Sequence, residues 1–294
     1  MKFITFLRND AEHLGVLTAD EKEFVDLSEA GIAPRMIDMI KGFDFLREPI
    51  ARLIANGSRH STSGLKLLAP IRTPSRNIFC IGKNYYEHAT EFGSSGFDSG
   101  SVGGNEVPEY PIIFSKPPSA VVGPHAGIAS ALDPYSSVDY EAELAVIIGR
   151  SGRVAAADDP MSFIFGYTII NDVTSRELQK RHKQWLLGKG IDTFAPMGPC
   201  IVTADEIADI GAQTIQLWVN GELRQSASIG QLIFDIPTLI RTIGSSITLQ
   251  TGDIIATGTP AGVGIGYKPP RYLVPGDRIR IEVPAIGILE NNVL

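Results

Sequence analysis

Three acids occupy alternate positions in residues 138–148, whose sequence is VDYEAELAVII. If this apolar segment is a β-strand, Asp139, Glu141 and Glu143 lie on one face, because side chains alternate between the two faces of a strand. Glu141 and Glu143 are then about 6.5 to 7 Å apart along the backbone, close enough to bind one cation. The same pattern also fits the solvent-exposed face of an edge strand.

A fourth acid, Asp172, follows a second apolar segment, residues 163–170 (FIFGYTII). An acid at the end of a buried strand commonly lines a cleft, although as part of an Asp-Val turn Asp172 could equally cap a helix. Three carboxylates without a Cys/His cluster would specify a hard cation, Mg²⁺ or else Mn²⁺ or Ca²⁺, rather than zinc. Asp139 would then be a further ligand or would lie behind the ligands.

Candidate groups for proton transfer lie on both sides of these acids in the sequence. His88 and Glu91 are three residues apart, one helical turn, so Glu91 could hold the imidazole while its other nitrogen removes a proton from water. Lys189 lies between two glycines, so its ammonium could approach a bound substrate without crowding. An exposed His/Glu pair and a lysine in a surface turn would have the same local sequences.

Other functional classes lack support in the sequence. It contains no Gly-x-Ser-x-Gly elbow, no His-Glu-x-x-His zinc helix, no phosphate-binding loop and no dinucleotide fingerprint. The net charge is −7 without any block of Lys and Arg, which argues against nucleic acid as a partner. Small anionic substrates stay compatible, because a bound cation and a few basic side chains can reverse the field inside a cleft.

The candidate residues fall within motifs that resemble the fumarylacetoacetate hydrolase family. Each motif alone is weak, whereas together in the family's order they are highly specific. The resemblance covers about Pro74 to the C-terminus, and residues 1 to about 70 match the family's variable N-terminal domain only loosely. The matching segments are IGKNYYEHATE (81–91), DYEAEL (139–144), NDVTSRELQ (171–179), GKGIDTFAPMGP (188–199), TGTPAGVG (257–264) and PGD (275–277).

The resemblance implies that Glu141, Glu143 and Asp172 bind a divalent metal ion, Mg²⁺ in the first instance, with substrate at its open positions. It implies that Lys189 contacts the negative charge that develops on the substrate, and that the His88/Glu91 pair is a base dyad. These four acids, together with His88 and Lys189, would form one catalytic centre.

Further positions match family residues near the substrate. Arg176 and Gln179 would share one face of the helix after Asp172, and Arg suits carboxylate recognition through its bidentate fork. The alternative is an exposed helix face. Thr259, with Gly258 beside it, could donate its hydroxyl and neighbouring amides to a substrate carboxylate, unless the glycines and proline only build a turn.

The resemblance, together with these residues, predicts a hydrolase that cleaves a carbon–carbon bond of an acylpyruvate-like β-diketo acid. Water activated by the histidine would attack the distal carbonyl, while the metal and Lys189 stabilise the departing enolate. Oxaloacetate decarboxylation and 2-hydroxy-dienoate isomerisation are alternatives on the same site, because they differ only in the fate of the enolate. In each case the ligand is a small anionic 2-oxo or 2,4-dioxo acid. A non-catalytic β protein with a structural metal is the alternative from another class.

Two domains are expected to position the site: a small α+β domain at 1–70 and a catalytic domain at 71–294. The whole chain is therefore expected to be α+β and mainly β. In the first domain, residues 2–7 and 14–17 predict short strands, residues 34–56 predict amphipathic helices, and residues 58–65 predict a linker.

The second domain alternates short strand-like segments with Gly/Pro turns, and the family's fold is a mixed β-sandwich or β-roll. Asn220-Gly221 predicts a two-residue hairpin turn, since both of its central positions need positive φ. The expected strands lie in NIFCIG (77–82), PIIFSK (111–116), LAVIIG (144–149), FIFGYTII (163–170), TIQLWVNGELR (214–224), DIIATG (253–258) and DRIRIEV (277–283).

Helices are expected at residues 175–185, capped by Thr174 or Ser175, and at residues 233–243. Residues 92–109 are rich in Gly and Ser without periodicity, which predicts an exposed, mobile loop and a candidate lid beside His88.

The cellular setting is expected to be a reducing cytoplasm. The two cysteines, Cys80 and Cys200, have apolar neighbours that favour buried free thiols. The first residues, MKFITFLRND, lack the continuous apolar core of a signal peptide, and no segment approaches a membrane span. The family resemblance implies a homodimer.

Overall fold

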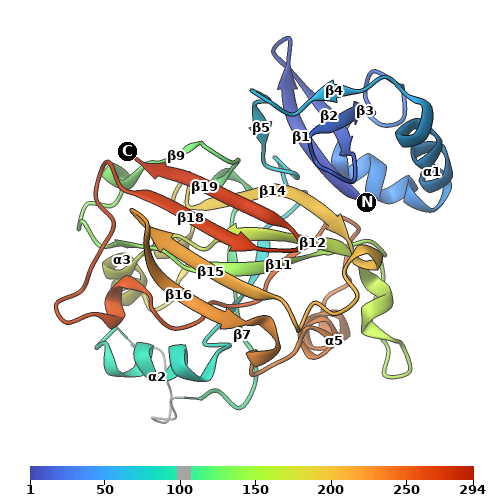
Figure 1. Cartoon of the computed structure of the whole chain (residues 1–294). Coiled ribbons are helices and arrows are strands. Elements are labelled where there is room, and N and C mark those ends of the chain that lie inside the picture. The colour runs from blue at the N-terminus through green and yellow to red at the C-terminus, as the bar shows by residue number, and fades with distance from the viewer. Residues whose placement is uncertain (98–106) are drawn as a thin grey trace.

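The computed structural model of the chain describes residues 1–97 and 107–294, and it is dominated by two β-sheets (Figure 1). The α+β, mainly β class predicted from the sequence is confirmed. The larger sheet has the order β4 (His60–Ser61), β3 (Glu23–Asp26), β2 (Ala11–Leu17), β1 (Lys2–Arg8), β14 (Ala195–Thr203), β12 (Ile164–Asn171), β11 (Ala142–Ile148), β17 (Ile254–Ala256), β6 (Ile78–Gly82) and β7 (Ile112–Lys116), with β5 (Leu67–Leu68) on β1 and β8 (Val121–Val122) on β14.

The smaller sheet packs against one face of the larger one. Its order is β16 (Glu222–Ser228), β15 (Thr214–Val219), β18 (Arg278–Val283), β19 (Gly287–Val293) and β9 (Gly127–Ile128), and a separate two-stranded ladder joins β10 (Val138–Asp139) to β13 (Thr174–Ser175). Figure 1 shows β15, β16, β18 and β19 in front of β11, β12 and β14. This sandwich matches the expected layering of the catalytic domain.

The larger sheet is buried on both faces, and β11 shows how. Leu144 and Val146 belong to the apolar core shared with the smaller sheet, whereas Ala145 and Ile147 belong to the cluster on the opposite face. Because side chains alternate along a strand, Glu143 lies on the same face as Ala145 and Ile147. The candidate metal ligands are therefore carried on the face away from the smaller sheet.

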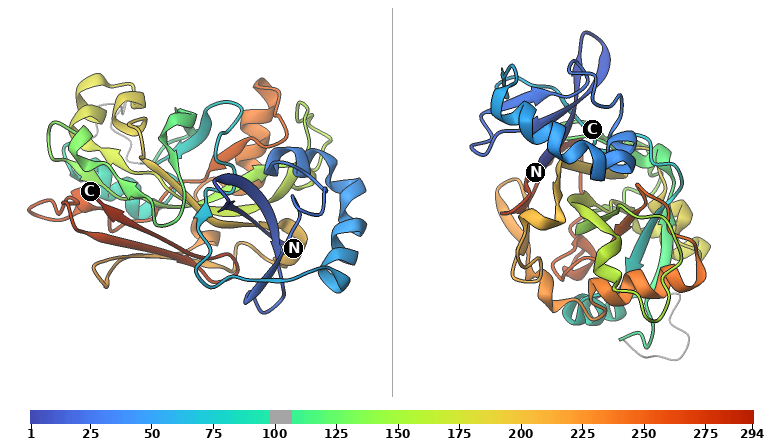
Figure 2. Two further views of the ribbon diagram at one scale, coloured as in Figure 1. Left: turned by 90° about the horizontal axis from the view of Figure 1, so that it is seen from above. Right: turned by 90° about the vertical axis from the view of Figure 1, so that its right-hand side faces the viewer.

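Residues 1–70 form five of the strands and helix α1 (Met36–Asn56), a segment that Figures 1 and 2 draw as a lobe at one edge of the molecule. The predicted strands and helical region are present, but the expected linker is wrong at His60–Ser61, because β4 pairs there with β3. Strand β1 also pairs with β14, so the lobe extends the larger sheet. The domain boundary near residue 70 stays a prediction.

The other α-helices among the described residues are α2 (Tyr86–Ser94), α3 (Arg176–His182), α4 (Leu186–Lys189) and α5 (Ile236–Ser246). The Ser175 hydroxyl caps α3 by accepting the N–H of Leu178, which selects Ser175 from the two predicted caps. The predicted helix at 175–185 ends earlier, at His182. Among the residues that the structure describes, no helix has the length and apolar character required to cross a bilayer.

The predicted exposed loop at 92–109 is wrong at its start. Residues 92–94 complete α2, and Phe92 is buried in a small apolar cluster with Val263 and Ile265. Since the structure describes nothing between residues 97 and 107, the lid prediction for residues 98–106 lies outside the described residues. The hairpin prediction is confirmed, because Asn220 and Gly221 join β15 to β16 with φ of 53° and 82°.

Candidate metal centre and active site

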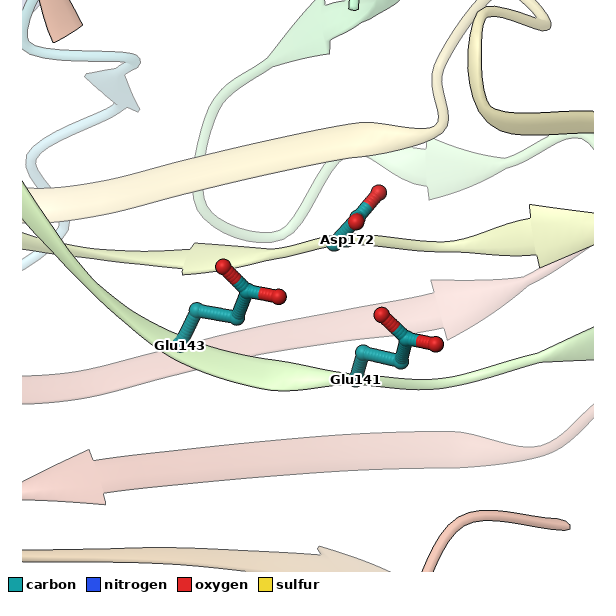
Figure 3. A group of neighbouring side chains, drawn as sticks. All are labelled: Glu141, Glu143 and Asp172. Atoms are coloured by element: carbon teal, nitrogen blue, oxygen red, sulfur yellow. The ribbon is translucent and has the colours of Figure 1, made fainter. Parts of the chain in front are cut away.

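Glu141, Glu143 and Asp172 are buried neighbours, and each offers a carboxylate oxygen within 4.8 Å of those of the other two. Glu143 lies on β11, Glu141 immediately precedes this strand, and Asp172 immediately follows β12. The antiparallel pairing places them together, since the N–H of Asp172 donates to the carbonyl of Glu141 at 2.8 Å. Figure 3 shows the three side chains on the same side of their strands.

The continuous strand predicted for 138–148 is interrupted at Tyr140–Glu141, and the interruption separates Asp139 from the other acids. Asp139 accepts hydrogen bonds from the N–H groups of Gly264 at 2.7 Å and Ile265 at 3.1 Å. It also accepts a bond from Nε of Arg176 at 2.9 Å. Asp139 is not part of the group formed by Glu141, Glu143 and Asp172, which fits the second of its two predicted roles, a position behind the candidate ligands.

Basic side chains contact two of the three carboxylates directly. The ammonium of Lys189 lies 2.7 Å from both Oε2 of Glu141 and Oδ2 of Asp172. The guanidinium of Arg176 lies 2.7 Å from Oε1 of Glu141, and the ammonium of Lys116 lies 2.7 Å from Oδ1 of Asp172. The alternative of a structural metal protein required Lys189 to be remote from Glu141, so this contact argues against it.

Glu143 is in a different electrostatic environment. Its Oε2 accepts the N–H of Gly258 at 2.8 Å, and within the described residues it forms no ion pair. Burial, with Asp172 and Glu141 nearby, raises the pKa of Glu143 well above its usual range. Burial would also raise the pKa of Glu141, but Lys189 and Arg176 outweigh it and lower that pKa to about 2.

This imbalance of charge fits a divalent cation. A buried carboxylate without a counter-charge is unfavourable, and a metal ion at the three ligand atoms would supply one to Glu143. Hard oxygen donors of this kind suit Mg²⁺, Mn²⁺ or Ca²⁺. The buried carboxylates of Asp139, Glu141, Glu143 and Asp172 outnumber their cationic partners Lys116, Lys189 and Arg176.

A small cavity of about 10 Å³ adjoins the carboxylates, and most of the sequence-predicted residues surround it. This is about the volume that one water molecule needs. Its lining includes Glu141, Glu143, His88, Lys189, Gln179 and Thr259, together with Lys83, Trp185 and Phe114.

His88 and Glu91 project from α2, with Nδ1 and Oε2 separated by 3.4 Å. The carboxylate of Glu91 also accepts the N–H of Gly262, at 3.1 Å to Oε1 and 3.2 Å to Oε2. A Cβ added at Gly266 would lie 1.8 Å from Oε1 of Glu91, so a glycine at this position allows the backbone to lie against the Glu91 side chain. His88 is buried and faces the cavity, as a base near a bound substrate must be.

Thr259 lines the cavity, and Gly258 beside it donates its N–H to Glu143. Gly258 has φ of +102°, a conformation that favours glycine, and this conformation presents its N–H to Glu143. The hydroxyl of Thr259 accepts a bond from Nε2 of Gln225 at 2.8 Å. Gln225, a residue that the sequence did not single out, therefore fixes the side chain of Thr259.

Arg176 and Gln179 share one face of α3 as predicted, and Nη1 of Arg176 donates to Oε1 of Gln179 at 3.2 Å. Arg176 is 0% exposed, and its contacts are with Asp139, Glu141 and Gln179. The guanidinium therefore orients the carboxylate of Glu141, a candidate metal ligand. Direct recognition of a substrate carboxylate by Arg176 stays a prediction.

Lys116 is the principal residue that sequence reasoning missed. Its only local signal is a lysine at the end of an apolar strand, PIIFSK. Its contacts are with residues that lie far along the chain, at Asp172, Val173 and Lys189. Burial lowers the pKa of Lys116, while Asp172 opposes this effect.

Comparisons with known proteins agree with this site. The family model described as fumarylacetoacetate (FAA) hydrolase C-terminal matches residues 77–294. Oxaloacetate tautomerase YisK of Bacillus subtilis (strain 168) is 42% identical over 312 residues, covering 100% of both chains.

Two solved structures resemble the whole chain. The fumarylacetoacetate hydrolase from psychrophilic Exiguobacterium antarcticum has a TM-score of 0.84 and 37% identity, covering 100% of this chain and 99% of the other. Maleylpyruvate hydrolase from Sphingobium sp. SYK-6, solved in complex with manganese (II) ion and pyruvate, has a TM-score of 0.80 and 34% identity over the same shares.

Proposed function

This chain belongs to the fumarylacetoacetate hydrolase family of enzymes, and on that basis we propose that it interconverts the enol and keto forms of oxaloacetate at a divalent metal centre. A relative similar over the whole length of the chain is an oxaloacetate tautomerase. The reaction transfers one proton between the enol oxygen and C3 and breaks no carbon–carbon bond.

The convergence of His88 and Lys189 on one cavity with Glu141 and Glu143 carries the proposal. Tautomerisation needs a group that exchanges a proton at carbon and a cationic environment for the oxygen. The histidine on α2 offers the first, and the buried ammonium between two carboxylates offers the second.

Glu141, Glu143 and Asp172 would hold the ion, with Mg²⁺ as the expected metal and Mn²⁺ or Ca²⁺ as alternatives. When bound, a divalent ion supplies Lewis-acid stabilisation of negative charge on a 2-oxo acid. Lys189 adds its own positive charge beside these carboxylates, and Arg176 fixes the position of Glu141.

His88 would carry the proton between C3 of the substrate and its enol oxygen, taking it from one and giving it to the other. Glu91 holds the imidazole through Nδ1, which leaves Nε2 for the transfer, and Gly262 in turn holds Glu91. Thr259, fixed by Gln225, presents its hydroxyl on the cavity wall, where it would orient a substrate carboxylate.

Hydrolysis of an acylpyruvate-like substrate is the second candidate. The same His88/Glu91 pair could activate water instead of exchanging a carbon-bound proton, and the similarity to a maleylpyruvate hydrolase at 34% identity favours it. We place it second because the tautomerase relative has the higher identity, 42%, over the full length of both chains.

A panel of small acids separates these reactions. Enol-oxaloacetate, keto-oxaloacetate and an acylpyruvate would be incubated with Mg²⁺-loaded enzyme, while ultraviolet absorbance follows the enol and a coupled assay follows pyruvate. We expect rapid loss of the enol without release of pyruvate. Rapid hydrolysis of the acylpyruvate or decarboxylation of oxaloacetate, with no acceleration of enol loss, would contradict the tautomerase assignment.

The expected homodimer stays a prediction. Sedimentation of the purified chain, whose mass is 31.7 kDa, at several concentrations would measure it, and a monomer at all concentrations would contradict it.

A further inference from the structure

Lys116 is the last residue of β7, and its side chain is 0% exposed in the interior between this strand, the end of β12 and α4. It does not belong to the residues that line the cavity, so it has no access to a substrate there. A buried ammonium is unfavourable unless its charge and all of its N–H groups have partners.

Each partner of Lys116 belongs to the segments that build the metal centre. The ammonium forms an ion pair with Oδ1 of Asp172 at 2.7 Å and donates to the carbonyl of Val173 at 2.9 Å. It also donates to the backbone carbonyl of Lys189. The ammonium thus donates two hydrogen bonds to backbone carbonyls, while Oδ1 of Asp172 balances its charge.

Lys116 contacts Lys189, the residue whose ammonium is proposed to stabilise charge on the substrate. Lys189 ends α4, a helix of four residues, and a helix this short has little stability of its own. Its backbone is held by Lys116, while its ammonium lies 2.7 Å from both Glu141 and Asp172. Asp172 is shared, because Lys116 contacts Oδ1 and Lys189 contacts Oδ2.

We propose that Lys116 is a positioning residue, which fixes the backbone of Lys189 and thereby places the Lys189 ammonium against the substrate oxygen. The assignment rests on the proposed function, because it gives Lys116 an effect on turnover only through Lys189. Displacing a reacting or stabilising group by about 1 Å can lower a rate by about 10²-fold.

A double-mutant cycle tests this. Lys116→Met keeps most of the side-chain length and removes the charge, Lys189→Met removes the catalytic ammonium, and the third variant carries both. We expect Lys116→Met to lower kcat for enol loss by about 10²-fold with KM within about threefold of wild type. In the Lys189→Met background, Lys116→Met should change kcat by less than about threefold.

A measurement without turnover accompanies the cycle. Mn²⁺ binding to Lys116→Met, followed by electron paramagnetic resonance, should stay within about tenfold of wild type, since all three carboxylates are retained. Arg76→Met is the matched control: Arg76 donates to the buried Asp253 at 2.7 Å, away from the cavity, so its loss should lower the melting temperature and leave kcat unchanged.

Three results would overturn the assignment. They are a wild-type kcat in folded Lys116→Met, an equal fold-loss of kcat from Lys116→Met with Lys189 present and in the Lys189→Met background, or loss of Mn²⁺ binding in Lys116→Met. If Lys116→Met does not fold, Lys116→Gln, which keeps two N–H donors, enters the same cycle with the same criteria. Wild-type activity in Lys189→Met alone would instead contradict the role of Lys189 in the proposed function.

Discussion

The two halves of the site are held in place in different ways. The metal half is built on neighbouring strands of the larger sheet, where Glu141, Glu143 and Asp172 meet and cations lie 2.7 Å from two of them. The acid–base half lies on α2, a helix of nine residues, and consists of His88 and Glu91. Nδ1 of His88 and Oε2 of Glu91 are 3.4 Å apart.

This difference leads us to expect that the two halves respond differently to small changes in structure. Strand register and burial determine where the carboxylates lie, so the metal half tolerates little variation. The acid–base half depends on contacts between α2 and the glycine-rich segment 262–266, including the bond from Gly262 to Glu91. A small shift there would change whether His88 faces a carbon-bound proton or a water.

The largest effect is expected in the metal half. Glu143→Gln removes a ligand charge, so Mn²⁺ binding and enol loss should both fall to the level of buffer. Calorimetric titration with Mn²⁺ measures the binding. Glu48→Gln, on the exposed part of α1, is the control and should match wild type. Retained Mn²⁺ affinity in Glu143→Gln would show that the three carboxylates are not one metal site.

The next effect belongs to the acid–base half. His88→Gln should lower kcat by about 10²- to 10³-fold, because a positioned proton-transfer group is lost, while Mn²⁺ affinity stays at the wild-type value. Steady-state kinetics of enol loss measures it, and His182→Gln on the exposed surface of α3 is the control. If His88→Gln lowered Mn²⁺ affinity as much as it lowers kcat, the two halves of the site would not be independent.

A smaller effect is expected at Glu91. Glu91→Gln keeps the size of the side chain but removes the charge beside the imidazole, so kcat should fall by about 10- to 100-fold. Glu87→Gln, exposed on the same helix, controls for changes in α2. If Glu91→Gln alters only the melting temperature, then Glu91 is structural and the dyad assignment is wrong.

The smallest effect is a change in stability with pH in metal-free protein. The pKa of Glu143 is raised in the folded state, so its contribution to stability is present below the unfolded value near 4.5 and is lost as the pH rises through the folded value. Glu143→Gln stays neutral, so it should raise the melting temperature of metal-free protein by a few °C at pH 8. Calorimetry at pH 5 should show a smaller difference, and no difference at either pH would contradict the raised pKa.

Local sequence predicted that the three carboxylates would lie close together. The alternate spacing of Glu141 and Glu143 and the strand end at Asp172 depend only on the two-residue period of a strand. The Asn220-Gly221 turn was similarly local, because both residues need positive φ. The carboxylate spacing and this turn would be present in any fold that forms the same strands.

The parts that could not be predicted depend on contacts between distant segments. Lys116 meets its acceptors only once β7, β12 and α4 are assembled, since Val173 and Lys189 are 57 and 73 residues away. Asp139 was expected on the face of Glu141, but the interruption at Tyr140–Glu141 turns it toward Arg176. The alternating pattern of residues 138–148 contains no sign of that interruption.

Metal dependence of enol loss tests the central claim most directly. Wild-type protein would be stripped with EDTA, dialysed and assayed for loss of enol-oxaloacetate before and after addition of Mg²⁺. The three-carboxylate site predicts a rate equal to that of buffer in stripped protein and full recovery with Mg²⁺ or Mn²⁺. Full activity in the stripped protein, with the removal of metal verified by elemental analysis, would contradict it.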